Sequence, residues 1–256
     1  MNVLPMFDLK GEKAIVTGGG QGLGKEMALA LAEAGADVLV AQRRVEVAEK
    51  VAEEIRAMGR DAMAVKVDVS NAADVEGMVK AAMDRFGKID ILINNAGIGQ
   101  AVWALNMSEE DWDSMMDIHV KGTFLCCQKV AREMSKVMKG RIVNISSMSA
   151  VIANRPQGQA HYNTAKAAIS HLTKSLAVEW TRFNIRVNAI APGYIKTALT
   201  TGGLESPVGQ EWLAMIPMGR AGEPHEIKGA ALFLASEASS YFTGSILIMD
   251  GGYTCW

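Results

Sequence analysis

The sequence predicts an α/β protein in which helices cover both faces of a doubly wound parallel sheet. Its 256 residues are 49% hydrophobic and 21% charged, a composition typical of a globular protein with a large core. Short runs rich in valine and isoleucine recur along the chain and are apolar on both faces, as buried parallel strands are. Alanine-rich amphipathic segments lie between these runs. This alternation predicts repeated βαβ units and hence a parallel sheet.

Seven segments are expected to be strands, in chain order residues 14–17, 38–41, 62–67, 89–94, 141–146, 186–191 and 245–249. The helices between them are expected to end at glycines, because a left-handed residue often closes a helix; these are Gly35, Gly59, Gly87 and Gly140. No linker interrupts the alternation, so residues 1–256 are predicted to form a single domain. The one long irregular stretch, residues 197–222, is predicted to be a lid over a site.

Charge and cysteine content narrow the class of protein. The 26 basic and 28 acidic residues are interspersed and give a net charge of −2, so the basic surface of a nucleic-acid-binding protein is not expected. The start MNVLPMFDLKGEK does not resemble a signal peptide, and no apolar run has the length of a membrane span. A cytoplasmic protein without a membrane partner is therefore expected. The three cysteines lack metal-site spacing, and Cys126 and Cys127 are interpreted as small core residues.

A glycine-rich segment, TGGGQGLG at Thr17–Gly24, follows the first predicted strand and opens a helix. Glycines at positions 18, 22 and 24 allow a tight turn and a close approach of backbone to a pyrophosphate, whose charge the helix N-terminus stabilises. Strand, turn and helix come in the order that dinucleotide binding requires. The segment, including Gln21 and Leu23, is therefore predicted to bind a nicotinamide dinucleotide.

The end of the second predicted strand indicates which dinucleotide. A fold of this kind that prefers NAD carries Asp or Glu about 20 residues past the glycines, to hold the ribose 2′-hydroxyl. This chain has Gln42 there, followed by Arg43 and Arg44. No carboxylate repels a 2′-phosphate, and the guanidinium of Arg43 can pair with one. NADP is predicted in preference to NAD.

The segment YNTAK places Tyr162 and Lys166 four residues apart, on one face of the helix after the fifth strand. A lysine ammonium near a tyrosine favours the phenolate and makes the hydroxyl usable for proton transfer. Ser147, at the end of the strand segment IVNISS, is placed to donate a hydrogen bond to a reacting oxygen.

Together these residues resemble the classical short-chain dehydrogenases/reductases over about Leu9 to Gly252. The resemblance implies a Rossmann fold and hydride transfer between a nicotinamide and a carbonyl or alcohol. It implies that Tyr162 is the acid/base, that Ser147 polarises the oxygen, and that Lys166 serves both the tyrosine and the nicotinamide ribose. It further implies cofactor contacts from Asp68, Val69, the NNAG segment with Asn95, Ala96 and Gly97, and Pro192, Gly193, Ile195 and Thr197.

One residue departs from the family pattern. Where the family has asparagine in N-x-x-G-x-F, this chain reads HVKGTF with His119. In the family the asparagine holds a water that links the lysine to solvent. An imidazole titrates near neutrality and can hold water or relay a proton, so His119 is either part of such a relay or only fills space. The other histidines, at 161, 171 and 225, lack zinc-site spacing, and no metal is predicted.

The segment between Ser147 and Tyr162 is rich in hydrogen-bonding side chains, among them Ser149, Asn154 and Gln159. Such a wall suits a substrate with several hydroxyls. NRPQGQAHYN also resembles the sugar-alcohol and ketose branch of the family, the sorbose reductases and the sorbitol, arabinitol and galactitol dehydrogenases. A ketose/polyol pair is the predicted substrate.

Two other functions are open. One is a β-ketoacyl thioester reductase of the same family, with Arg132, Lys136 and Lys139 as a surface for an acidic carrier protein. The other is a non-catalytic NADP-binding regulator. Resemblance to the family also implies a homotetramer or dimer built on the fourth and fifth helices and the last strand.

Overall fold

A computed structural model describes residues 2–256 and places seven parallel strands in one sheet, in the order β3-β2-β1-β4-β5-β6-β7. Each strand lies within two residues of a predicted segment: β1 Lys13–Thr17, β2 Asp37–Gln42, β3 Ala62–Lys66, β4 Ile91–Asn94, β5 Gly140–Ile145, β6 Ile185–Pro192 and β7 Ile246–Met249. The predicted α/β fold class is confirmed. None of the helices in the described part of the chain is long and apolar enough to cross a membrane.

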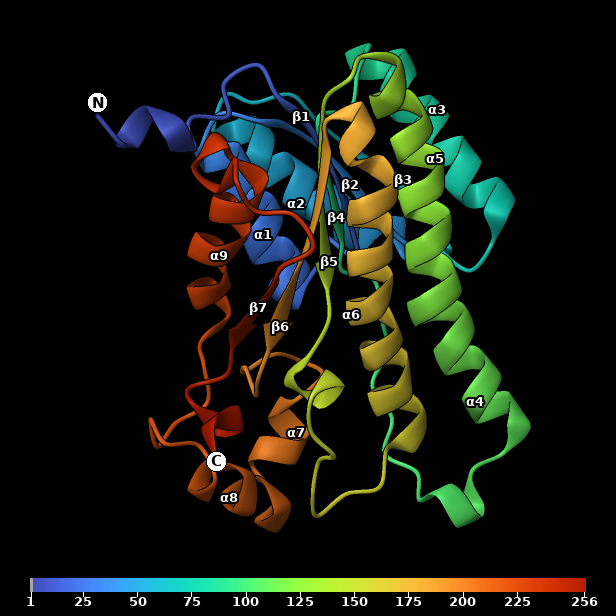
Figure 1. Cartoon of the computed structure of the whole chain (residues 1–256), viewed down its shortest axis with the longest axis vertical. Coiled ribbons are helices and arrows are strands. Elements are labelled where there is room, and N and C mark those ends of the chain that lie inside the picture. The colour runs from blue at the N-terminus through green and yellow to red at the C-terminus, as the bar shows by residue number, and fades with distance from the viewer. Residues whose placement is uncertain (1) are drawn as a thin grey trace.

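Helices cover both faces of the sheet (Figure 1). One face carries α1 Gly22–Glu33, α2 Val45–Ala57 and α9 Ile227–Ala235; the other carries α3 Ala72–Phe86, α4 Glu109–Met116, α5 Gly122–Lys136 and α6 Ala160–Trp180. Alternate strand residues supply two separate cores, so Val16 packs beneath the first set and Ile15 beneath the second. This two-sided burial explains why apolar residues point to both faces of the strands.

Three of the four predicted helix-closing glycines are in the left-handed region, with φ of +107° at Gly35, +78° at Gly59 and +74° at Gly87. The prediction for Gly140 is wrong, because Met138 takes the left-handed conformation after α5 (φ +52°). Gly140 instead opens β5, where an added Cβ would lie 2.3 Å from the Met134 sulfur. Close packing requires this glycine, and helix capping does not.

The stretch predicted to be irregular, residues 197–222, contains two short helices, α7 Thr201–Leu204 and α8 Pro207–Ala214. Both lie beyond the carboxyl ends of the strands, beside the loop that leads into α6 and close to the C-terminus (Figure 1). The expectation of irregular structure is therefore corrected.

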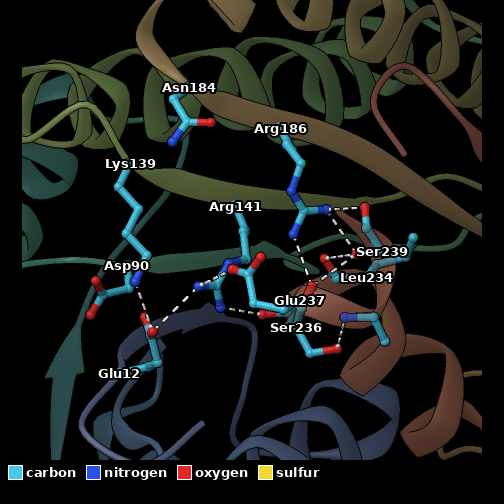
Figure 2. Close-up of polar contacts among 12 residues, drawn as sticks. Glu12, Asp90, Lys139, Arg141, Asn184, Arg186, Leu234, Ser236, Glu237 and Ser239 are labelled. Atoms are coloured by element: carbon cyan, nitrogen blue, oxygen red, sulfur yellow. Dashed lines mark hydrogen bonds and ion pairs between the residues drawn. The ribbon is translucent and has the colours of Figure 1, made fainter. Parts of the chain in front are cut away.

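A cluster of charges occupies the opposite, amino-terminal edge of the sheet (Figure 2). Arg141 is 3% exposed and pairs with Glu12 at 3.3 Å and Glu237 at 3.0 Å. Its guanidinium also donates to the Ala235 carbonyl at 2.7 Å. Burial acts to raise the pKa of Glu12, but Lys139 and Arg141 lower it below its ordinary value. The cluster ties β1, β5 and the segment after α9 together.

Candidate active site

The glycine-rich turn lies at the point where the strand order reverses, between β1 and β4. The chain leaves these neighbouring strands in opposite directions, and such a reversal opens a crevice at their carboxyl ends. Gly18 and Gly22 have φ of +63° and +53°, which favours glycine. A Cβ on Gly24 would lie 2.1 Å from the Gly18 carbonyl oxygen, so α1 approaches the turn this closely only with glycine there.

The NNAG segment after β4 holds this turn from the neighbouring strand. The Thr17 hydroxyl accepts hydrogen bonds from the backbone N–H groups of Asn95 (3.1 Å) and Ala96 (3.2 Å). The Asn95 side chain donates to the carbonyls of Thr17 (3.2 Å) and Gly18 (3.0 Å). Asn95 therefore shapes the turn as well as lining the crevice, and the part played by Thr17 was not anticipated from the sequence.

Two adjoining cavities, of about 500 Å³ and 230 Å³, occupy the crevice and share Gly18, Gln21 and Ala96. All but one of the predicted cofactor residues line them. Arg43, Asp68 and Val69 line the larger, and the smaller is lined by Gly22, Leu23, Asn95, Tyr162, Lys166, Pro192, Gly193, Ile195 and Thr197, with Gly97 common to both. The exception is Gly24, which packs against the turn and lines neither.

Two arginines stand at the rim of the larger cavity, after the end of β2. Arg43 and Arg44 are exposed, and Arg44 lies 3.4 Å from the Gln21 side-chain oxygen. The Gln42 side chain accepts from the Gly20 backbone N–H at 3.4 Å, so it braces the turn. A hydrogen bond from Ser70 is the main reason that the pKa of Asp68 lies below its ordinary value, and the charge of Arg43 adds to it.

Ser147, Tyr162 and Lys166 all line the smaller of the two cavities, the inner cavity of about 230 Å³. Ser147 follows β5, and the other two lie one turn apart near the start of α6. The Lys166 Nζ lies 5.5 Å from the centre of the Tyr162 ring and donates to the Ile145 carbonyl at 2.8 Å. The structure thus brings together three side chains that are up to 19 positions apart in the sequence, as predicted.

The electrostatics differ from the sequence expectation. Burial raises the pKa of Tyr162, and the neighbouring Ser147 hydroxyl offsets only part of that rise. Burial also lowers the pKa of Lys166 to about 7. Burial disfavours the charged form of both groups, so the net shift of the Tyr162 pKa is upward, and the lowering expected from the lysine ammonium stays a prediction.

His119 lies in a π-helical turn, residues Asp117–Lys121, between α4 and α5. Its ring is 2% exposed and stands edge-on to Tyr162, with centroids 5.6 Å apart. Nε2 lies 2.8 Å from the Ile98 carbonyl, and Nδ1 has no hydrogen-bond partner among the residues that the structure describes. A Cβ on Gly97 would lie 2.4 Å from the ring, so the glycine of NNAG makes room for this imidazole.

The pKa of His119 is lowered to about 3, chiefly by burial and further by the charge of Lys166. The expectation that this imidazole titrates near neutrality is therefore wrong. The side chain is neutral at physiological pH, and it can act on water only through its uncharged form.

A third cavity, of about 410 Å³, adjoins the inner one and shares Ser147 and Tyr162 with it. The three predicted substrate residues line it. Gln159 connects the other two, because its Nε2 donates to the Asn154 Oδ1 at 3.1 Å and to the Ser149 Oγ at 3.5 Å. Among residues 2–256 no three His, Cys, Asp or Glu side chains come together as a metal site would require.

Two aromatic residues on the far wall of this cavity were missed. Tyr194 and Trp212 stack in parallel with centroids 4.4 Å apart, and the Trp212 N–H donates to the Gln157 side chain at 2.9 Å. Gln157 also donates to the Tyr194 hydroxyl at 3.1 Å. Tyr194 lies between predicted residues Gly193 and Ile195, and this position was the only signal in the sequence.

Comparisons with known proteins agree with the geometry. A family model described as enoyl-(acyl carrier protein) reductase matches residues 18–254. Galactitol 2-dehydrogenase of Rhizobium johnstonii is 44% identical over 261 residues, and the match covers all of both chains. The 3-oxoacyl-(acyl-carrier-protein) reductase FabG of Chlamydia pneumoniae is 42% identical, over 96% of this chain and 98% of that enzyme.

Two solved structures superpose over the full length of the chain. A short-chain type dehydrogenase/reductase from Mycobacterium marinum is 44% identical, with a TM-score of 0.97 and complete coverage of both chains. A gluconate 5-dehydrogenase from Burkholderia cenocepacia, in complex with NADP and tartrate, is 37% identical, with a TM-score of 0.95 and the same coverage.

Proposed function

The chain belongs to the short-chain dehydrogenase/reductase family and is an oxidoreductase that acts on alcohol and ketone groups, and from that premise we propose that it interconverts ketoses and polyols with NADP(H). The observation that carries the substrate class is the third cavity. Half-buried amide side chains and serine hydroxyls line it beside Ser147 and Tyr162, together with apolar side chains such as Met148, Leu199 and Val208. The polar groups favour a ligand that pairs with them, and the apolar ones can pack against its carbon skeleton.

The crevice fits a nicotinamide dinucleotide. The left-handed glycines of the turn have no side chains to cover its backbone. The two cavities together extend from Arg43 at one end to Tyr162 at the other. Arg43 and Arg44 are exposed where a 2′-phosphate would lie, and Gln42 brings no negative charge there. This charge balance supports NADP, and the gluconate dehydrogenase solved with NADP supports it as well.

The residues of the inner cavity have distinct proposed roles. A bound nicotinamide supplies or accepts the hydride. Ser147 donates a hydrogen bond to the substrate oxygen, and Tyr162 gives that oxygen its proton during reduction. Because burial raises its pKa, Tyr162 is protonated at neutral pH and suited to ketone reduction. Lys166, held by the Ile145 carbonyl, lies against the tyrosine and within reach of a cofactor ribose.

The β-ketoacyl thioester reductase is the second candidate, because a 3-oxoacyl reductase is 42% identical. The contacts of two of the three cations expected to bind a carrier protein do not support this function. Lys136 pairs with Glu133 at 2.6 Å, and Lys139 pairs with Glu12 at 2.9 Å in the cluster at the amino-terminal edge. Lys136 is the last residue of α5 and Lys139 directly precedes β5, whereas Ser147 follows the opposite, carboxyl end of β5. The regulator hypothesis is set aside because the chain is an enzyme.

The proposal is tested with a panel of ketoses, their polyols and a 3-oxoacyl thioester, each with NADPH or NADP and with NADH or NAD. Turnover is read at the nicotinamide absorbance, and Tyr162→Phe serves as the catalytically silent control. We expect the highest kcat/KM with a ketose and NADPH. Turnover confined to the thioester would refute the ketose assignment.

Three further expectations belong to the proposal. The segment 197–222 acts as a lid on the single domain of residues 1–256, and the enzyme works in the cytoplasm. It assembles as a homotetramer. Exposed apolar side chains in or near α4, α5 and β7 supply contact surfaces, namely Trp103, Leu105, Trp112, Phe124, Tyr241, Phe242 and Ile248. Sedimentation of the protein as a monomer would contradict the assembly.

A further inference from the structure

Two serine hydroxyls stand side by side where the substrate cavity meets Tyr162. Ser147 and Ser149 are 7% and 5% exposed, and their Oγ atoms lie 3.1 Å apart. Both line the cavity of about 410 Å³. The Ser149 backbone N–H donates to the Ser147 Oγ at 3.1 Å and fixes that oxygen in the short turn at residues Met148–Ala150.

The hydrogen bonds of this pair are incomplete. Ser147 donates to the Ser149 Oγ, whereas no residue among 2–256 accepts a hydrogen bond from the Ser149 hydroxyl. The Gln159 Nε2 has two hydrogens and three acceptors, and Ser149 is the most distant of them at 3.5 Å, behind Asn163 at 2.9 Å and Asn154 at 3.1 Å. Within the described part of the chain, Ser147 is thus the only close side-chain donor to Ser149.

Substrate binding removes that donor. In the proposed function Ser147 turns its hydrogen to the reacting carbonyl oxygen, which leaves the buried Ser149 hydroxyl without a close donor and still without an acceptor. An unpaired buried hydroxyl is costly. A substrate hydroxyl at the right place relieves this cost, because its oxygen accepts the hydrogen of the Ser149 hydroxyl.

The separation of the two serines sets that place. Oxygens on neighbouring carbons, when gauche, are about one hydrogen-bond length apart, as the two Oγ atoms are. We infer that Ser149 is a specificity-determining residue that reads a hydroxyl on the carbon next to the reacting one, so that the enzyme selects α-hydroxy ketones and vicinal diols. This inference rests on the proposed function, and it makes the vicinal oxygen pair, and not the whole sugar, the recognised unit.

Three four-carbon ketones separate this reading from a general preference for polar substrates. They are 2-butanone, 1-hydroxy-2-butanone and 4-hydroxy-2-butanone, in which the hydroxyl is absent, on the neighbouring carbon or one carbon further away. We expect kcat/KM for 1-hydroxy-2-butanone to exceed that for each of the other two roughly tenfold to a hundredfold, the range of one buried hydrogen-bonding group. Equal values for the two hydroxy ketones would overturn the inference.

Ser149→Ala should bring the ratio of 1-hydroxy-2-butanone to 2-butanone close to one. Ser170→Ala is the matched control, because Ser170 belongs to another serine pair, with Ser146 at 2.7 Å, and lines none of the three cavities. It should keep the wild-type ratio. Retention of the wild-type ratio by Ser149→Ala would also overturn the inference.

The two proposals fail in different ways. If ketoses are reduced but the hydroxy ketone has no advantage, the inference on Ser149 fails and the proposed function stands. If no ketone is turned over, the proposed function fails. Calorimetric titration of the three ketones into the protein with NADPH then decides on Ser149: tighter binding of 1-hydroxy-2-butanone, lost in Ser149→Ala, supports the reading, and equal affinities refute it.

Discussion

Replacing His119 by asparagine should make the protein more resistant to acid. The folded protein lowers the pKa of this imidazole from 6.5 to about 3, mainly because the ring is buried. The unfolded chain therefore binds the proton more readily, and acid favours unfolding. The stability that depends on a neutral His119 is present above pH 6.5 and is lost as the pH falls from there toward 3. Asparagine does not titrate and carries no such dependence.

The size of the effect follows from the two pKa values. Between pH 7 and pH 5 the unfolded wild-type histidine becomes almost fully protonated while the folded one stays neutral, which costs about 2 kcal/mol at 1.36 kcal/mol per pH unit. Carboxyl groups are common to both proteins, so their contribution cancels in the comparison.

The assay is urea unfolding of wild type and His119→Asn at pH 7 and pH 5. We expect the wild type to lose about 2 kcal/mol more than the variant between the two pH values. Parallel losses would show that burial does not lower the pKa of His119 as described. The pH profile of kcat/KM supplies a second check, because a step near pH 6.5 that vanishes in the variant would refute the neutral imidazole.

Three other outcomes are expected. Gln42→Asp combined with Arg43→Leu should reverse the preference for NADPH over NADH, since it adds charge repulsion and removes a phosphate partner; equal wild-type affinity for both cofactors, measured by fluorescence titration, would contradict the premise. Tyr162→Phe should abolish turnover but keep NADPH binding, whereas Lys166→Ala should impair both; an active Phe variant would refute the assignment of Tyr162. Arg141→Met should lower the free energy of unfolding by about 3 kcal/mol, the lower end for a broken buried ion pair because Lys139 still pairs with Glu12; a loss below 1 kcal/mol in urea unfolding would show that the pair is dispensable.

Features set by local sequence could be predicted. The strands follow from apolar runs, and the glycine turn with the YNTAK helix follows from spacing. The prediction for Gly140 failed because the residue that leaves no room for a Cβ there, Met134, comes close only when α5 packs against β5. Tyr194 and Trp212 stack although 18 positions separate them, and no local pattern encodes such a contact. The shifted pKa values of His119 and Lys166 depend on burial, which is a property of the folded chain.

The cluster around Arg141 bears on how this protein can change over generations. Arg141 and its partners lie at the amino-terminal edge of the sheet (Figure 2), whereas the three cavities lie at the carboxyl edge. Substitutions in the loops at the two edges share no contacts, so their effects should combine additively. A laboratory selection for activity on a new ketone can therefore accept substitutions around Asn154 and Trp212 while the ion pairs of Arg141 stay intact. Because the Arg141 cluster and the substrate cavity lie at opposite ends of the strands, selection can change which substrates the enzyme accepts without changing the contacts that stabilise its fold.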